Sequence, residues 1–318
     1  MAGDAVLTQR LRKTIVILLE KCMKALKLLA GVAVVPAVAA ALVLNPFSPS
    51  PGLANGAAAT AAQPDKPRTA QLSDYEPTVG QEGKDVVWVP TAQSLVNKML
   101  DMAKLTPSDY LVDLGSGDGR TVITAAKRGA TAHGIEYNPK MVELSKRNAE
   151  KEGVSAKATF AQADIFESDF SKADVVTMFL LPELNLRLRP TILKMKPGTR
   201  VVTNSFSMGD WTADQTESVN EDCRSYCTAF LWIVPANAAG TWKLPQGDLT
   251  LEQKFQLVSG NLKSGGNSTA VTEGRLNGEQ IVFKAGGTEY SGKVAGDTME
   301  GVARTGGKEE KFQATRVK

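Results

Sequence analysis

Hydrophobic positions between residues 90 and 242 follow two alternating patterns along the chain. Some segments repeat apolar residues at a helical period, and short β-branched runs lie between them, as in a series of β-α-β units around a parallel sheet. We expect, in chain order, a helix at 91–104, strand 110–114, helix 119–128, strand 131–136, helix 138–152, strands 157–162 and 174–180, helix 183–194 and strand 199–205. Two further apolar runs, Ala229–Val234 and Gly240–Leu244, should pair antiparallel at one edge of this sheet. The pattern therefore predicts an α/β domain over residues 85–245, mostly parallel with an antiparallel edge.

After residue 246 apolar and polar positions alternate, and turn dipeptides interrupt the alternation. These dipeptides recur about every nine or ten residues, at Asn277-Gly278, Gly286-Gly287, Gly296-Asp297 and Gly306-Gly307. The apolar side chains between them fall on one face of the strands: Ile281, Phe283, Tyr290, Val294, Met299, Ala303, Phe312 and Ala314. We predict a small antiparallel β domain at 246–318, without a residue cluster that suggests chemistry, which serves packing or partner binding. Its apolar face needs cover from the α/β sheet, a second copy of the chain or another protein.

The N-terminal region contains an uncharged apolar run, Leu28 to Leu44, which follows a basic segment at 1–27. Such a run is at the short end of what spans a bilayer, and it predicts an apolar N-terminal helix and a single-pass membrane anchor. The alternative is a cleaved signal peptide and export, although the small-x-small sites at 57–61 lie far beyond Leu44. Residues 45–84 are rich in Pro, Ala, Gly, Ser and Asp and predict a flexible linker. The side of the membrane on which the folded part lies stays open.

Composition excludes several classes of function. Hydrophobic residues make up 42% and charged residues 22% of 318 residues, which fits about two globular domains rather than a disordered chain. One histidine, His133, and three cysteines are too few for a zinc cluster, so we expect no metal site and catalysis without histidine. Cys223 and Cys227 could form a short-loop disulfide or lie on one face of a helix. The formal charge of +3 is concentrated in residues 1–27, so the rest of the chain lacks the basic surface that nucleic acid requires.

The segment Asp113 to Arg120, DLGSGDGR, carries the clearest chemical signal. A buried strand ends in an acidic residue and three alternating glycines, Gly115, Gly117 and Gly119, and a helix follows at once. Glycines let a ligand approach the main chain, and the helix N-terminus offers free N–H groups. The spacing D-x-G-x-G-x-G differs from the dinucleotide fingerprint G-x-G-x-x-G. The Asp113 carboxylate suits a ligand with an amino group and a sulfonium, and we therefore predict S-adenosylmethionine as the cofactor.

Two more acidic residues end the next two strands. Glu136 is placed to accept hydrogen bonds from both ribose hydroxyls of that cofactor. Asp164 is placed to reach the adenine amino group. One acidic residue at a strand end is weak evidence, whereas three strand ends in this order predict a complete cofactor site.

The stretch from Val86 to Trp242 resembles the class I S-adenosylmethionine-dependent methyltransferases. More narrowly, it resembles membrane-anchored mitochondrial protein-lysine methyltransferases and bacterial homologues with an N-terminal apolar segment and a C-terminal β extension. The motifs that carry the resemblance are VWVPT (87–91), DLGSGDGR (113–120), GIEYNP (134–139) and FLLP (179–182). The resemblance implies a Rossmann-like methyltransferase sheet and methyl transfer to a protein lysine amine. Trp88 departs from the family, in which tyrosine is frequent, and the continuation at Glu183 to Asn185 does not match one substrate.

The sulfonium already activates the methyl group, so the protein mainly aligns an acceptor lone pair and excludes water. For a lysine acceptor, a desolvated aromatic entry would lower the amine pKa. Candidates for the acceptor site are the aromatic residues Trp88, Phe179, Phe206 and Trp211 and the polar residues Asn185 and Asn204. We favour the two tryptophans over the two phenylalanines because they lie in irregular segments near strand ends.

Three functions compete. The first is methyl transfer to a protein lysine, and the second is methyl transfer to a small-molecule or lipid-like acceptor. The third is a cofactor-binding interaction protein that acts through its β domain, against which the intact set of Asp113, Glu136 and Asp164 argues. We expect a protein partner and a membrane as partners, and no nucleic acid.

Overall fold

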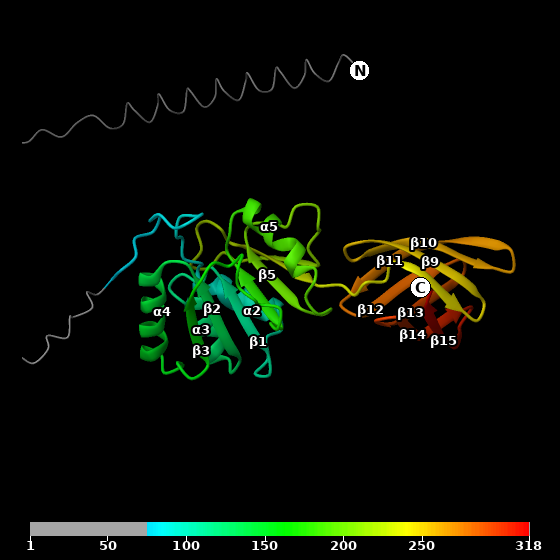
Figure 1. Cartoon of the computed structure of the whole chain (residues 1–318), viewed down its shortest axis with the longest axis horizontal. Coiled ribbons are helices and arrows are strands. Elements are labelled where there is room, and N and C mark those ends of the chain that lie inside the picture. Colours follow the sequence, from blue (N-terminus) through cyan, green and yellow to red (C-terminus); the bar gives the residue numbers. More distant parts are fainter. Residues whose placement is uncertain (1–74, 318) are drawn as a thin grey trace, which may run out of the picture. The chain divides into compact units, whose positions relative to one another are not determined.

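The computed structural model describes residues 75–317 and confirms the predicted α/β architecture (Figure 1). A seven-stranded sheet has the order β3-β2-β1-β4-β5-β7-β6. Its strands are β1 (Tyr110–Leu114), β2 (Thr131–Glu136), β3 (Ala158–Gln162), β4 (Val175–Met178), β5 (Arg200–Asn204), β6 (Gln215–Ser218) and β7 (Thr228–Ile233). Strands β1 to β5 are parallel, whereas β7 is antiparallel to both β5 and β6. The carboxyl ends of the parallel strands therefore meet at one edge.

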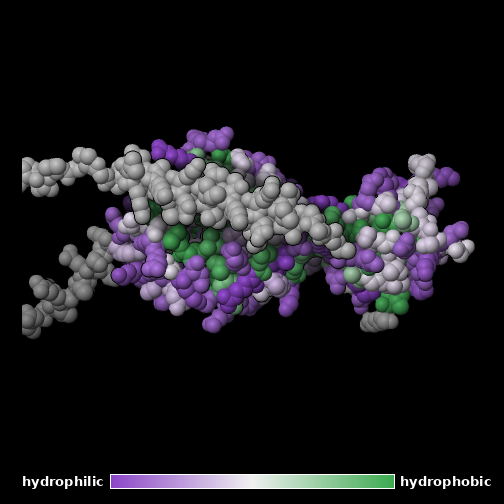
Figure 2. Space-filling model, turned by 90° about the horizontal axis from the view of Figure 1, so that it is seen from above, coloured by the Kyte–Doolittle hydropathy of each residue, from purple (hydrophilic) through white to green (hydrophobic). Residues whose placement is uncertain are grey.

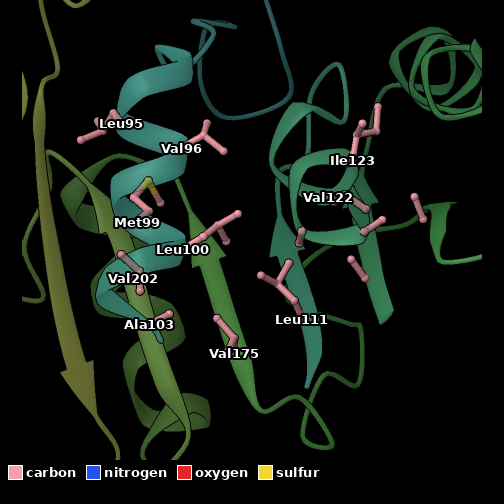
Figure 3. Packing of buried hydrophobic residues seen from close by; sticks show 14 of the residues in the cluster. Leu95, Val96, Met99, Leu100, Ala103, Leu111, Val122, Ile123, Val175 and Val202 are labelled. Carbon is pink, nitrogen blue, oxygen red and sulfur yellow. The ribbon is translucent and has the colours of Figure 1, made fainter. Parts of the chain in front are cut away.

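Helices cover both faces of this sheet. They are α2 (Gln93–Met102), α3 (Arg120–Lys127), α4 (Pro139–Lys151) and α5 (Pro182–Ile192). Buried side chains of α2, α3 and α4 share one hydrophobic cluster, and those of α5 belong to the cluster on the other face. Figure 3 shows Met99 and Leu100 of α2 facing the strands that carry Val175 and Val202. Local capping explains where α4 starts, because the Asn138 side chain accepts a hydrogen bond from Lys140 N and proline occupies the first turn.

One predicted strand belongs elsewhere. We expected Gly240–Leu244 at the edge of the sheet beside the 229–234 run, but this segment is β8 and pairs with β9 and β15. The sheet edge beside β7 is occupied instead by β6, whose polar sequence QTES gives no strand signal. Pro235 lies two residues after the end of β7 and lacks the N–H that a continuing strand would need. The chain therefore leaves the sheet before β8 begins.

The C-terminal part is a closed antiparallel barrel. Its strands are β8 (Gly240–Leu244), β9 (Gly247–Lys254), β10 (Leu257–Ser264), β11 (Asn267–Asn277), β12 (Gln280–Ala285), β13 (Thr288–Ala295), β14 (Thr298–Thr305) and β15 (Lys308–Arg316). All four predicted turn dipeptides lie in the hairpins that join β11 to β15. The predicted apolar face is also confirmed, since its residues belong to one cluster inside the barrel. The expectation that another surface must cover this face is wrong. Because β15 pairs with β8, the sheet closes into a barrel and buries its own apolar side chains inside.

Specific contacts join the start of the barrel to the sheet region. The ring of Phe255 stacks on Trp211 with centroids 5.7 Å apart. Arg275 also forms an ion pair with Asp214, with the guanidinium and carboxylate 2.6 Å apart. The two parts therefore share an apolar and a charged contact within residues 75–317.

The predicted apolar helix at 28–44 lies outside the described residues, as do the 1–27 segment and most of the 45–84 linker. Across residues 75–317, no helix is both long enough and apolar enough to cross a bilayer. Within the described residues, this finding contradicts the expected localisation at a membrane. On the face drawn in Figure 2, hydrophilic residues predominate among the described residues and hydrophobic ones form separate patches.

Candidate functional site

A cavity of about 400 Å³ lies at the carboxyl ends of the parallel strands. Its lining comes from loops that follow β1, β2, β3, β4 and β5 and from the segment 81–91. Open α/β sheets bind their ligands at this edge, and the cavity volume suits a small organic molecule. Asp113, Glu136 and Asp164 all line it, although they are far apart in the sequence.

The loop after β1 is built on glycines with positive φ. Gly115, Gly117 and Gly119 have φ values of 76°, 55° and 83°, which only glycine adopts without strain. A side chain at Gly117 would come within 2.7 Å of the Trp88 indole nitrogen. Gly115 and Gly117 line the cavity, whereas Gly119 caps α3 and packs against the Phe160 ring. Gly119 therefore supports the conformation of the loop without lining the cavity.

Asp113 is a carboxylate buried at the floor of the cavity, with 6% of its surface exposed. It lies opposite Thr177 on the neighbouring strand, and the Thr177 hydroxyl donates to its Oδ1 over 2.6 Å. Burial raises the pKa of Asp113 to about 7, nearby Asp118 and Glu136 add to the rise, and the Thr177 hydrogen bond opposes it. A cation bound in the cavity would stabilise the ionised form.

Glu136 and Asp164 hold the loops around them. Glu136 accepts hydrogen bonds from Gly117 N over 3.0 Å and Asn138 N over 2.9 Å, which ties the glycine loop to the start of α4. Asp164 accepts from Phe166 N over 2.9 Å. It also pairs with Lys84 at 2.5 Å. Lys84 and the Phe166 N–H hold the pKa of Asp164 below its usual value.

The segment before α2 places Trp88 in the cavity. Backbone hydrogen bonds from Gly80 N to Trp88 O and from Trp88 N to Gln81 O fold this segment into a turn. The Trp88 indole lies over the glycine loop, close to Gly117. Trp88 therefore lines the cavity close to the glycine loop, and its contact with a methyl acceptor stays a prediction.

Three aromatic rings pack against one another and form a wall of the cavity, which we call the aromatic wall. Phe179 follows β4, Phe206 follows β5, and Tyr226 lies in the β6–β7 loop. Ring centroids are 6.1 Å apart for Phe179 and Phe206, 5.2 Å for Phe179 and Tyr226, and 5.9 Å for Phe206 and Tyr226. Tyr226 was not predicted from the sequence, where the spacing of Cys223 and Cys227 is the only signal near it. Those two cysteines form a disulfide.

The other predicted acceptor-site residues lie outside the cavity lining. Trp211 is fully buried and contacts the rings of Trp232 and Phe255. Asn204 is also buried, and its Nδ2 donates to the Thr91 hydroxyl over 3.1 Å. Asn185 Nδ2 donates to the Phe206 carbonyl over 3.1 Å. These side chains fix the loops that carry the wall, and the preference for Trp211 over Phe179 and Phe206 has no support in the geometry.

His133 lies on β2 and bonds the Thr159 hydroxyl, away from the cavity lining. Among residues 75–317, no group of three or more histidine, cysteine, aspartate or glutamate side chains could hold a metal ion. The cavity lining itself contains the buried carboxylate of Asp113, the partly exposed carboxylates of Glu136 and Asp164, and several aromatic rings.

The raised pKa of Asp113 predicts a pH dependence of stability. An aspartate ionises near 3.8 when unfolded and at about 7 here, so the folded protein retains a proton that the unfolded chain releases between these values. The free energy of unfolding should therefore fall as pH rises through this window and level off above it. Urea unfolding at a series of pH values measures the free energy of unfolding. The same series with the Asp113→Asn variant isolates the contribution of the Asp113 carboxyl. Parallel pH profiles for the two proteins would contradict the burial argument.

Comparisons with known proteins place this geometry among related chains. The family model of the ANTKMT methyltransferase domain matches residues 113–215. A protein-lysine N-methyltransferase of Saccharolobus islandicus is 41% identical over 152 residues, which is 47% of this chain and 94% of that protein. A human lysine N-methyltransferase, named for a component of ATP synthase, is 36% identical over 128 residues, 40% of this chain and 54% of that protein. The chain thus spans nearly all of the first relative and about half of the second, and neither name indicates a membrane anchor.

A solved structure gives a further comparison. The RNA methyltransferase of Salinibacter ruber, in complex with S-adenosyl-L-homocysteine, has 42% sequence identity and a TM-score of 0.44. The comparison covers 47% of this chain and 95% of that protein.

Proposed function

Because this chain belongs to the class I S-adenosylmethionine-dependent methyltransferases, we propose that it transfers a methyl group from S-adenosylmethionine to the ε-amine of a protein lysine. One observation carries the proposal: the glycine loop and the rings of Phe179, Phe206 and Tyr226 line one and the same cavity. Both relatives are named lysine N-methyltransferases, which supports the choice of acceptor.

The residues around the glycine loop fit S-adenosylmethionine. Gly115 and Gly117 leave the backbone open to a ligand, and the buried Ser116 hydroxyl in the same loop has no hydrogen-bond partner within residues 75–317. We propose that Asp113 holds the amino end, Glu136 the ribose and Asp164 the adenine. When bound, this cofactor supplies a methyl group that its sulfonium has already activated. The chain itself has to position the acceptor and keep water out.

The aromatic wall supplies a reason for an amine acceptor. Ring faces attract an ammonium group, and their apolar surface removes water from it. Desolvation lowers the pKa of a lysine amine and so favours the neutral form that can attack a methyl group. Asn185 and Thr203 donate hydrogen bonds to the Phe206 carbonyl and hold this part of the wall in place.

Transfer of labelled methyl groups tests this function. The full chain is incubated with methyl-tritiated S-adenosylmethionine and a soluble cell extract, and label is measured in precipitated protein and in the organic phase. We expect label in the protein fraction. The amount of this label should fall strongly with the Asp113→Ala variant. Label that migrates only with the organic phase would instead identify a small-molecule or lipid-like acceptor.

The predicted boundary at residues 245 and 246 lies between β8 and β9, and we propose instead that the cofactor domain ends near Asn237, because β8 pairs with β9 and β15 of the barrel. A chain that ends at Asn237 should retain S-adenosylmethionine affinity within about threefold, because every proposed cofactor residue precedes residue 165. Its melting temperature should fall, since it loses the stack of Phe255 on Trp211. Calorimetric titration and thermal unfolding measure both. A soluble, folded truncation that fails to bind the cofactor would mean that the barrel contributes to the cofactor site.

A further inference from the structure

The loop between β6 and β7 brings a third ring to the aromatic wall, and a disulfide closes this loop. Cys223 and Cys227 are bonded, with Cα atoms 5.8 Å apart, and Tyr226 lies inside the ring that they form. Val219 N donates to Cys227 O over 2.9 Å, which continues the antiparallel pairing up to the disulfide. The base of the loop is therefore fixed on both strands.

Tyr226 is held in a conformation that it would not adopt alone. Its φ is 59°, in the left-handed region, which is strained for a bulky non-glycine residue and persists only where neighbours impose it. The disulfide supplies one constraint at the adjacent residue. The other limb of the loop is anchored on α2, where the Ser94 hydroxyl donates to Glu221 O over 2.7 Å.

The position of the Tyr226 ring suits contact with a ligand rather than a role in the core. The ring packs against Phe179 and Phe206, yet 44% of the residue is exposed. It lines the same cavity as the glycine loop, and exposed Val87 and Leu181 also line that cavity. A large ring that lines a cavity and is about half exposed to solvent can pack against the side chain of a ligand that enters the cavity.

We propose that Tyr226 is an acceptor-binding residue that completes the three-ring entry for the lysine side chain, and that the Cys223–Cys227 disulfide is the device that positions it. This inference rests on the proposed lysine methylation. The ring face receives the ammonium and the aliphatic stem of the acceptor, and the cofactor end of the cavity, formed by Asp113, Glu136 and Asp164, does not depend on the loop.

Reduction of the disulfide should release the ring. A dithiol such as dithiothreitol donates two electrons and two protons to the S–S bond, closes to its own cyclic disulfide, and leaves thiols at Cys223 and Cys227. Without the covalent closure, the left-handed conformation of Tyr226 loses its main constraint. The acceptor should then bind more weakly while the cofactor binds as before.

The test uses the full chain, methyl-tritiated S-adenosylmethionine and a graded concentration of soluble cell extract as acceptor. Tyr226→Ala should raise the extract concentration for half-maximal labelling about three- to thirtyfold, as expected for loss of one cation–π contact. Tyr226→Phe keeps the ring and should stay close to the unmodified protein. The S-adenosylmethionine dissociation constant, measured by calorimetry, should be unchanged in both variants.

The positioning role has its own control. Dithiothreitol, or the Cys223→Ser/Cys227→Ser double substitution, should weaken acceptor binding in the unmodified protein and have no further effect in Tyr226→Ala, because the disulfide acts through that ring. Additive effects in the two backgrounds would overturn the positioning role. Unchanged half-maximal labelling in Tyr226→Ala, with protein still labelled, would overturn the inference alone. Absence of any protein label with the unmodified chain would overturn the proposed function itself.

Discussion

Asp113→Ala is expected to weaken S-adenosylmethionine binding about ten- to a hundredfold, because a charge-assisted hydrogen bond contributes about 1.5–3 kcal/mol. Asp113 is the buried carboxylate at the floor of the cavity, beside the glycine loop. Burial raises the pKa of Asp113 to about 7. A cationic ligand is attracted most strongly by the ionised carboxylate, so it binds best where Asp113 is ionised. Affinity should therefore also strengthen as pH rises through about 7.

Asp113→Asn is the matched control for this variant. The amide oxygen can still accept the hydrogen bond that the Thr177 hydroxyl donates to Asp113, so the packing of β1 against β4 is retained while the charge is lost. Calorimetric titration of both folded variants measures the dissociation constants. Affinity that is unchanged in both would remove Asp113 from the cofactor site.

Trp211→Ala is expected to lower the free energy of unfolding by about 3–5 kcal/mol, the range for truncation of a buried large aromatic residue. Trp211 is fully buried between Trp232 and Phe255, and its carbonyl accepts a hydrogen bond from the Trp232 indole over 2.7 Å. The substitution opens a void where the sheet region meets the barrel. Urea or thermal unfolding measures the loss.

Trp211→Phe retains a ring and should cost much less. At temperatures where Trp211→Ala is still folded, its affinity for S-adenosylmethionine should stay close to that of the unmodified protein, because Trp211 does not line the cavity. Loss of methyl transfer with no loss of stability would return Trp211 to the acceptor site.

The convergence of the three proposed cofactor residues on one cavity was predictable because their positions follow from local sequence. Each of Asp113, Glu136 and Asp164 ends or follows a strand with a clear hydrophobic pattern. Parallel strands in one sheet end at the same edge, so three separate segments converge without any further information. The hairpins of the barrel were predictable for the same reason, since each turn lies between the two strands it joins.

The residues proposed around the acceptor were not predictable, because their positions depend on contacts between distant segments. Trp211 follows a strand end, as a site residue would, but it packs on Phe255 from the start of the barrel. Tyr226 reaches the cavity only because the polar strand β6, which has no hydrophobic pattern, pairs with β7 and the disulfide closes the loop between them. Closure of the barrel likewise needs β15 to pair with β8, about seventy residues earlier.

The most direct test of lysine methylation is the identity of the amino acid that receives the methyl group. Protein labelled by the full chain with methyl-tritiated S-adenosylmethionine is hydrolysed, and its amino acids are separated against standards. The account predicts label in mono-, di- or trimethyl-lysine, and a strong decrease of that label with Asp113→Ala. Label in another amino acid, with none in methylated lysine, would contradict it.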